Sequence, residues 1–131
     1  MGESEPKSPP QRGERERLPD DRRGTTKRFR LGRYNFYATV NCYEDDRPGE
    51  LFLRVGASAP RGLGRPTVAG LCEALSIAVS VGLQRGVPLE AYVEKFERMR
   101  FEPDGAVGPV EGRALSVVDA LARWMRARFL R

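Results

Sequence analysis

The residues that could bind a ligand are concentrated in a single loop with the sequence RGLGRPT. Arg61 and Arg65 would attract a phosphate group, while Gly62 and Gly64 would let the backbone approach it. Thr67 precedes an apolar run with helical spacing, and the N–H groups at a helix N-terminus bind anions. The loop matches neither a Walker A sequence nor a dinucleotide-binding fingerprint. A surface loop without a ligand explains the same composition, so both interpretations stay open.

The sequence indicates no catalytic residue and no metal site. The chain has no histidine and two cysteines, so neither a Ser-His-Asp nor a Cys-His arrangement can be assembled within it. Cys42 falls in a predicted strand and Cys72 on an apolar helix face, where a small core hydrophobe is the simpler interpretation. The acidic run Glu44-Asp45-Asp46 lies in a predicted turn and lacks the further ligands that a cation needs. We therefore expect no catalytic residue and no bound metal in this chain.

Three runs of residues predict an antiparallel sheet. Residues 25–31 have strand propensity, and apolar and polar side chains alternate over residues 34–43, as in a half-buried strand. Residues 50–56 follow a Pro-Gly turn and form a third strand, which makes a hairpin with the second. Tyr37 and Tyr43 would remain exposed and could stack on nucleic-acid bases, although core packing explains most of the alternation.

The apolar spacing then changes to three and four residues, which predicts helices. One helix covers 68–83, a second starts at Pro88, and a third covers 117–129. The first is apolar on more than one side, and the third carries an aromatic stripe of Trp124 and Phe129. Because a small sheet and short helices would not cover all of this apolar surface, we expect a homo-oligomer.

Polar residues mark the predicted helix starts. Thr67 is a candidate N-cap for the first long helix, and Ser116 with Asp119 resembles a capping box. Residues 106–114 are predicted to be a loop. The expected fold is α+β, a small antiparallel sheet of about three strands packed with about three helices.

The basic charge is concentrated at the N-terminus. The first 33 residues hold ten Lys/Arg and six Asp/Glu, and Leu18 is the only large aliphatic residue between the initiator and Arg28. Such a segment buries too little apolar surface to offset the entropy of ordering it. We expect a basic, disordered segment over 1–24 and a single domain over 25–131. The segment could bind nucleic acid weakly through its charge, although a solvated linker is the simpler interpretation.

No segment of the sequence has the features of a targeting signal or a membrane anchor. The N-terminal residues lack the apolar core of a secretory signal, and no run approaches the ~18 uncharged apolar residues of a membrane helix. Two cysteines do not make a disulfide framework, which favours a reducing compartment. We expect a cytoplasmic protein without a membrane partner.

Several stretches of the sequence, in this order, resemble one known family: RLPD at 17–20, CYEDDRPGELFL at 42–53, SIAVSVGLQRGVPLE at 76–90, RFEPDG at 100–105 and SVVD at 116–119. They are similar to the C-terminal region of class II, adenosylcobalamin-dependent ribonucleotide reductases, including its TSCPD-type domain. The resemblance runs from about Arg15 to Leu130. Several matched stretches in one order are more specific than a single short motif.

The departures from that family concern its chemistry. The large catalytic barrel, with its thiyl-radical cysteine and paired reducing cysteines, has no counterpart in this sequence. The Thr-Ser-Cys-Pro-Asp signature is present only as LSVVD, which keeps Ser116 and Asp119. No catalytic residue of the family can therefore be carried over. By resemblance, adenosylcobalamin belongs to the missing catalytic part, and we expect no cofactor in this chain.

The resemblance implies a stand-alone homologue of the reductase C-terminal domain, with a non-catalytic accessory, assembly or ligand-binding role in deoxyribonucleotide synthesis. Alone, it would not be an enzyme, and a reductase catalytic chain is the expected partner. One alternative is a free-standing protein that binds a nucleotide or a cyclic-nucleotide-like signal. A third is a nucleic-acid contact module that uses the basic N-terminal segment.

Overall fold

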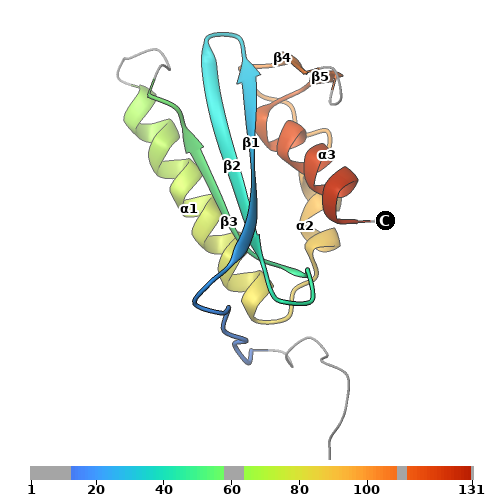
Figure 1. The fold of residues 1–131 in the computed structure, drawn as a ribbon. Helices are drawn as coiled ribbons and strands as arrows, with labels where there is room; N and C mark the ends of the chain where they lie inside the picture. Colours follow the sequence, from blue (N-terminus) through green and yellow to red (C-terminus); the bar gives the residue numbers. More distant parts are fainter. Residues whose placement is uncertain (1–12, 58–63, 109–111, 131) are drawn as a thin grey trace, which may run out of the picture.

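A computed structural model describes residues 13–57, 64–108 and 112–130 of the 131-residue chain. Within these residues the fold is α+β, as predicted: a three-stranded antiparallel sheet in the order β1-β2-β3, three helices, and a small second pair of strands (Figure 1). The elements are β1 Arg23–Leu31, β2 Tyr34–Cys42, β3 Pro48–Val55, α1 Gly64–Gln84, α2 Leu89–Phe96, β4 Gly105–Gly108, β5 Gly112–Ala114 and α3 Val117–Phe129.

Tight turns set the register of the main sheet. Leu31 pairs with Tyr34 across a two-residue turn in which Gly32 has a φ of 60°, a left-handed value that favours glycine. β2 returns into β3 through a longer turn, with a bulge beside Cys42. The third strand begins at Pro48, two residues before the predicted start, because the Pro-Gly pair belongs to the strand instead of the turn.

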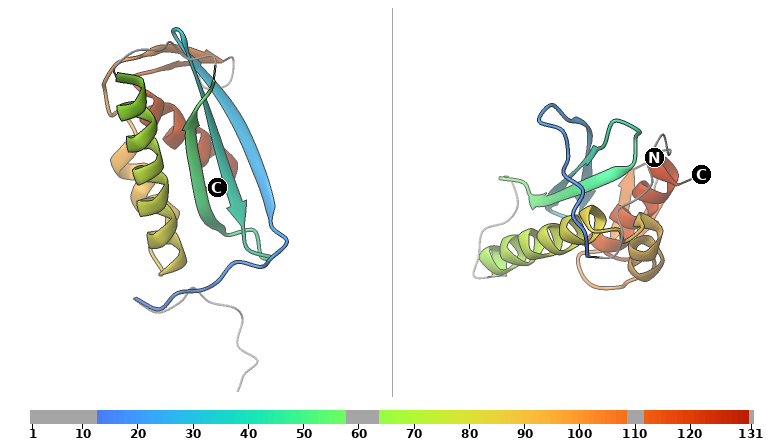
Figure 2. Two further views of the ribbon diagram at one scale, coloured as in Figure 1. Left: turned by 90° about the vertical axis from the view of Figure 1, so that its left-hand side faces the viewer. Right: turned by 90° about the horizontal axis from the view of Figure 1, so that it is seen from below.

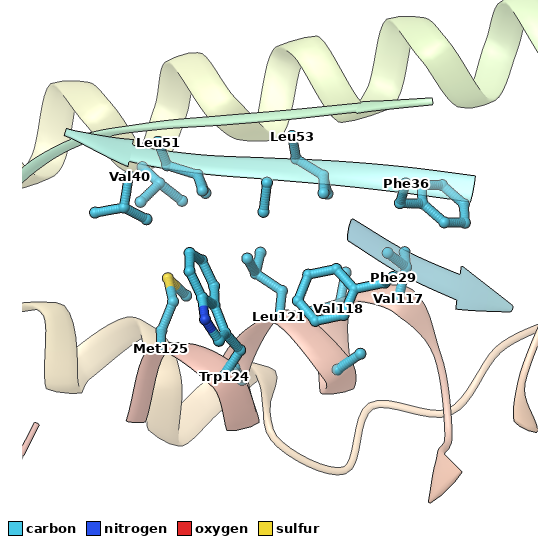
Figure 3. Packing of buried hydrophobic residues seen from close by; sticks show 14 of the residues in the cluster. Phe29, Phe36, Val40, Leu51, Leu53, Val117, Val118, Leu121, Trp124 and Met125 are labelled. Atoms are coloured by element: carbon cyan, nitrogen blue, oxygen red, sulfur yellow. The ribbon is translucent and has the colours of Figure 1, made fainter. Parts of the chain in front are cut away.

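The alternating residues of the sheet form one wall of the hydrophobic core. Phe29, Phe36 and Leu51 are at most 1% exposed, and they point toward α3 (Figure 3). Trp124 packs edge-to-face on Phe29, with ring centroids 6.1 Å apart. Trp124 is buried and Phe129 packs against the same core, so the expected role of this aromatic stripe in self-association is wrong.

Helix α1 lies along the free edge of β3 (Figures 1 and 2). The Ser80 hydroxyl accepts a hydrogen bond from the Leu51 N–H at 2.8 Å, and the Ser76 hydroxyl accepts one from the Leu53 N–H at 2.7 Å. The Gln84 amide donates to the Gly49 carbonyl at 3.1 Å. These three side chains, spaced four residues apart, take the place of a fourth strand and satisfy backbone groups that would otherwise lack partners.

The N-terminal boundary of the domain differs from the predicted one. Residues 13–22 run against the body of the protein, although residues 1–24 were expected to be disordered. Leu18 is buried and packs over Gly49, where an added Cβ would lie 2.6 Å from the Leu18 side chain. Glu16 accepts hydrogen bonds from both terminal nitrogens of Arg47, at 2.9 and 2.7 Å. A single leucine with specific polar contacts orders this segment, which composition does not predict; residues 1–12 lie outside the described residues.

Two further local predictions are wrong. Thr67 does not cap α1, because the helix already begins at Gly64. Part of the predicted loop over 106–114 is paired as β4 and β5. Both errors come from glycine-rich stretches, whose weak local preferences are overridden by the surrounding structure.

The start of α3 is held by a buried polar pair. The Ser116 hydroxyl accepts a hydrogen bond from the Asp119 N–H at 3.0 Å, which is the predicted N-cap, and donates to the Met99 carbonyl at 2.6 Å. The fully buried Asp119 carboxylate accepts from the backbone N–H groups of Leu115 and Arg98, at 2.9 and 2.8 Å. The pair therefore joins α3 to the segment that follows α2.

We expect Ser76→Ala and Ser80→Ala each to destabilise the protein by about 1–3 kcal/mol, because each removes the partner of a strand N–H. The better helix propensity of alanine offsets about 0.5 kcal/mol at most. Urea denaturation measures the change. Thr67→Ala, at an exposed position of the same helix, is the matched control and should change stability by less than about 0.5 kcal/mol. Serine variants as stable as the control would contradict the role of α1 as an edge cover.

Asp119→Asn should cost about 1–3 kcal/mol, since an amide NH₂ would face a backbone N–H in a buried site and leave it unsatisfied. Thermal and urea unfolding measure the loss. Asp104→Asn, which changes an exposed carboxylate, is the control. Equal stability of the two variants would show that the buried carboxylate does not hold the start of α3.

Candidate functional site

A groove of about 730 Å³ lies between the outer side of β3 and helix α1. Side chains of α1 hydrogen-bond to the edge of β3, and the groove lies beside this contact. The exposed side chains of Phe52, Ile77 and Val81 supply apolar surface along it. A volume of this size is within the usual range for small-molecule sites.

Arginine side chains border the groove. Arg15 donates to the Gln84 side chain at 2.9 Å, and Arg85 donates to the Gly13 carbonyl at 2.7 Å, so the N-terminal segment and the end of α1 bring both guanidinium groups to one end. Arg54 lies on β3 and stacks over the Tyr37 ring, 4.7 Å from its centroid. The guanidinium groups retain further N–H donors beyond these contacts.

The acidic residues of the groove do not cancel this charge. Glu50 is buried, and its carboxylate binds Arg22 at 2.5 and 2.6 Å. Glu73 is the other acidic residue that lines the groove. Three arginines therefore face two carboxylates, one of which already has a cationic partner, and the groove combines positive charge with an apolar wall.

The predicted ligand loop does not line this groove. Arg61 and Gly62 lie outside the described residues. Gly64 and Thr67 are exposed in the first turn of α1, and Arg65 folds back to donate to the Gly56 carbonyl at 3.1 Å. Arg65 therefore contacts the chain just after β3. The described residues of the predicted loop, Gly64, Arg65 and Thr67, do not form a common binding site.

Sequence reasoning missed the groove residues, although one signal was present. Phe52 is an aromatic residue on the opposite side of its strand from Leu51 and Leu53, where a solvated face would carry a polar side chain. The positions of Arg15 and Arg85 could not be inferred, because they meet only through the contact between the N-terminal segment and α1.

A second, smaller cavity of about 310 Å³ opens beside the N-terminal half of α1. Its wall includes Tyr34, Leu71, Cys72 and Phe101 and is mostly apolar. Burial raises the pKa of the Cys72 thiol, and burial is also the main cause of the raised pKa of Cys42. Both residues are buried free thiols, as predicted for core positions, and a thiol with a raised pKa is a poor nucleophile at neutral pH.

The exposed aromatic platform expected on β2 is not present. Tyr43 is 4% exposed, and its hydroxyl donates to the Glu16 carbonyl at 2.7 Å beneath the Arg47 guanidinium. Tyr37 is half-buried under Arg54. Base stacking on these two rings is therefore obstructed. Among the described residues, no group of three or more metal-binding side chains occurs.

Comparison with known proteins identifies relatives for almost the whole chain. The TSCPD domain family matches residues 7–129. The chain is 47% identical over 117 residues to a vitamin B12-dependent ribonucleotide reductase of Streptantibioticus cattleyicolor, covering 88% of this chain and 18% of that protein. The reductase of Streptomyces clavuligerus gives the same identity with 12% of its length covered, and that of Rhodopirellula baltica gives 39% identity with 11% covered.

No solved structure matches the chain. The chain spans less than a fifth of the length of these curated relatives. The family match nevertheless extends over nearly all of the 131 residues and includes every described element of the fold. The resemblance noted in the sequence is confirmed, and the chain belongs to the TSCPD domain family.

Proposed function

We propose that this chain is a non-catalytic accessory domain that acts with the catalytic part of a vitamin B12-dependent ribonucleotide reductase. The observation that carries the proposal is the 47% identity over 88% of the chain to proteins of that name, of which the chain covers only 12–18%. A region so similar to one part of a large enzyme supports a role in its assembly or regulation. Deoxyribonucleotide synthesis in the cytoplasm is the corresponding process.

The side chains of the matched motif support a structural role for it. Ser116 and Asp119, which the sequence shares with the family signature, bind backbone groups at the start of α3 and in the segment at Arg98 and Met99. Asp119 also forms an ion pair with Arg123, one turn further along α3. Cys42 and Cys72 are buried within the core. None of these groups faces the groove between β3 and α1, where a substrate would have room.

The cofactor named for the relatives does not fit the described part of the chain. A cobalamin is several-fold larger than the drug-sized ligands that pockets of 300–1,000 Å³ hold. The groove between β3 and α1 is about 730 Å³, within that range, and charged side chains border it. We assign the cofactor to no residue of this chain.

Complementation in trans tests the accessory role. The Streptomyces clavuligerus reductase is prepared without the region that matches this chain, and ribonucleotide reduction is measured with and without the added chain. We expect the added chain to bind the shortened reductase and raise its activity or stability, and to show no turnover alone. Asp119→Asn, with a loosened α3, should be a weaker partner. Turnover by the isolated chain, or an unchanged shortened reductase, would overturn the proposal.

The groove supports a second candidate function, nucleotide binding. Phe52 can stack on a base, and Arg54 and Arg85 can bind phosphate oxygens through charge-assisted hydrogen bonds. The mixture of an apolar wall and guanidinium groups fits an amphipathic anion of this kind better than a neutral or cationic ligand. The basic N-terminal segment as a nucleic-acid contact stays a prediction, since no described contact bears on residues 1–12.

Nucleotide titration tests the groove. We expect ATP or dATP to raise the melting temperature and Arg54→Glu to abolish the effect, because the substitution reverses a charge at the groove. Arg33→Glu, the same change in an exposed hairpin turn away from the groove, is the control. Phe52→Ala should weaken binding by about 1–3 kcal/mol if a base stacks on the ring. If inorganic phosphate and nucleotides raised the melting temperature equally, stacking of a base on Phe52 would be contradicted. If neither raised the melting temperature, nucleotide binding would be excluded.

A further inference from the structure

The outward face of α1 is apolar, and the nearest exposed charged residue, Glu73, lies on the adjoining flank that lines the groove. Leu71, Ile77 and Val81 are 66%, 57% and 50% exposed, which makes them among the most exposed large apolar residues described. The remaining residues of this face are also exposed and are small or uncharged: Thr67, Gly70, Ala74 and Ala78. A solvated helix face normally carries charged residues, and a helix that is apolar all round is normally covered.

The helix cannot relieve this exposure by rotating. Its opposite side is bonded to the β3 edge through Ser76, Ser80 and Gln84, and Cys72 and Val79 are buried in the core. Any rotation that buried Ile77 would break these hydrogen bonds and leave strand N–H groups unsatisfied. The uncharged face is therefore a fixed feature of the surface.

The spacing of this face is that of a helix-pairing seam. Gly70, Ala74, Ile77 and Val81 are separated by four, three and four residues, which is the repeat that aligns one helix with another. Their sizes are ordered, with two small residues toward the helix N-terminus and two large ones toward the C-terminus. A second α1 in antiparallel orientation would place Gly70 against Val81 and Ala74 against Ile77.

This order of sizes distinguishes the orientations. In the antiparallel pair, each layer combines one small and one large side chain, which fills the space evenly. In a parallel pair, Gly70 would meet Gly70 and Ile77 would meet Ile77, so one end would be hollow and the other crowded. Antiparallel helix dipoles also attract each other. The face is complementary to itself in one orientation only.

We propose that α1 pairs with α1 of a second copy of this chain, antiparallel across a two-fold axis through the seam of Gly70, Ala74, Ile77 and Val81. From Thr67 to Val81 the contact is about 21 Å long at 1.5 Å per residue. We expect so short a two-helix contact to bury less than the roughly 800 Å² per partner of a standard interface, and the dimer to dissociate in the micromolar range. This inference does not depend on the accessory role, but Ile77 and Val81 of the seam also line the groove proposed for nucleotides.

Sedimentation velocity of the full chain across the micromolar range tests the dimer. We expect a concentration-dependent monomer–dimer equilibrium, and a monomer for Ala74→Glu, which places a charge in the seam. Ala69→Glu makes the same change at an exposed position of α1 outside the seam and should leave the equilibrium unchanged. Melting temperatures of the two variants, measured at a concentration where the wild type is monomeric, separate lost pairing from lost folding.

Disulfide trapping tests the orientation. Ala74→Cys and Ile77→Cys chains are mixed and mildly oxidised, with the two native cysteines buried. The antiparallel pair places position 74 against position 77 and predicts a disulfide between the two different variants, whereas a parallel pair predicts disulfides between two copies of the same variant. A chain that stays monomeric, a dimer unaffected by Ala74→Glu, or a predominance of the like-with-like bridges would overturn the proposal.

A lipid membrane or the reductase itself could instead cover the outward face of α1, and each would give a different experimental result. By length and composition alone, α1 is the one helix of the described residues that could cross a membrane. Flotation of the chain with phospholipid vesicles, lost in Ala74→Glu, would assign the face to a lipid surface. A monomeric chain whose Ala74→Glu variant fails to bind the shortened reductase would assign the face to the reductase and leave the accessory function intact. Either result overturns the second-copy proposal.

Discussion

The hydrogen bonds between α1 and the edge of β3 constrain most of the remaining structure. A strand edge presents backbone groups about every 6.6–6.8 Å, which is two residues, and one helix side presents residues about every 6.0 Å, which is four residues. This near match lets Ser80 meet Leu51 and Ser76 meet Leu53, with Gln84 reaching Gly49 one step further. A single helix therefore closes the edge that would otherwise be open to another strand.

The attachment of α1 to β3 through Ser76, Ser80 and Gln84 has three consequences. Its inner side contributes Cys72 and Val79 to the core beneath the sheet. Its other flank and the outer side of β3 diverge, and the groove bordered by Arg54 and Arg85 lies between them. Its outward face, with Leu71, is left to solvent or to a partner, and Ile77 lies where that face meets the groove. The groove and the proposed dimer seam thus have one cause.

The far side of the domain depends on a different set of polar groups. Ser116 and Asp119 fix the start of α3 against Arg98 and Met99, and Arg126 on α3 binds Glu97 at the end of α2 at 2.6 Å. The hydrogen bond from Arg126 lowers the pKa of the Glu97 carboxyl, so this pair is intact at neutral pH and weakens as the pH falls through that lowered pKa. Ser116 and Asp119, the residues shared with the reductase signature, thus stabilise the fold of this chain through their hydrogen bonds.

The sequence by itself determined the α+β class, the alternation that buries one face of β2, and the identity of the family. These properties are local, because strand period, helix period and matched stretches are each read within a few consecutive residues. The N-cap at Ser116 was likewise predictable. The reciprocal contact of Asp119 was predicted only in type, since its carboxylate binds the N–H of Leu115 and of the distant Arg98.

Only the tertiary structure decided the rest. A serine in an apolar helix has the same sequence signature whether it faces solvent or a strand edge. The hydrogen bonds of Ser76 and Ser80 to the edge of β3 therefore could not be predicted from the sequence. Leu18 is ordered by a site on Gly49 that exists only after β3 has folded. The groove needs Arg15, Arg54 and Arg85 from three segments, and the seam of α1 is visible only once the opposite side is known to be occupied. In each case the determining contact joins residues far apart in the chain, and local preferences carry no information about it.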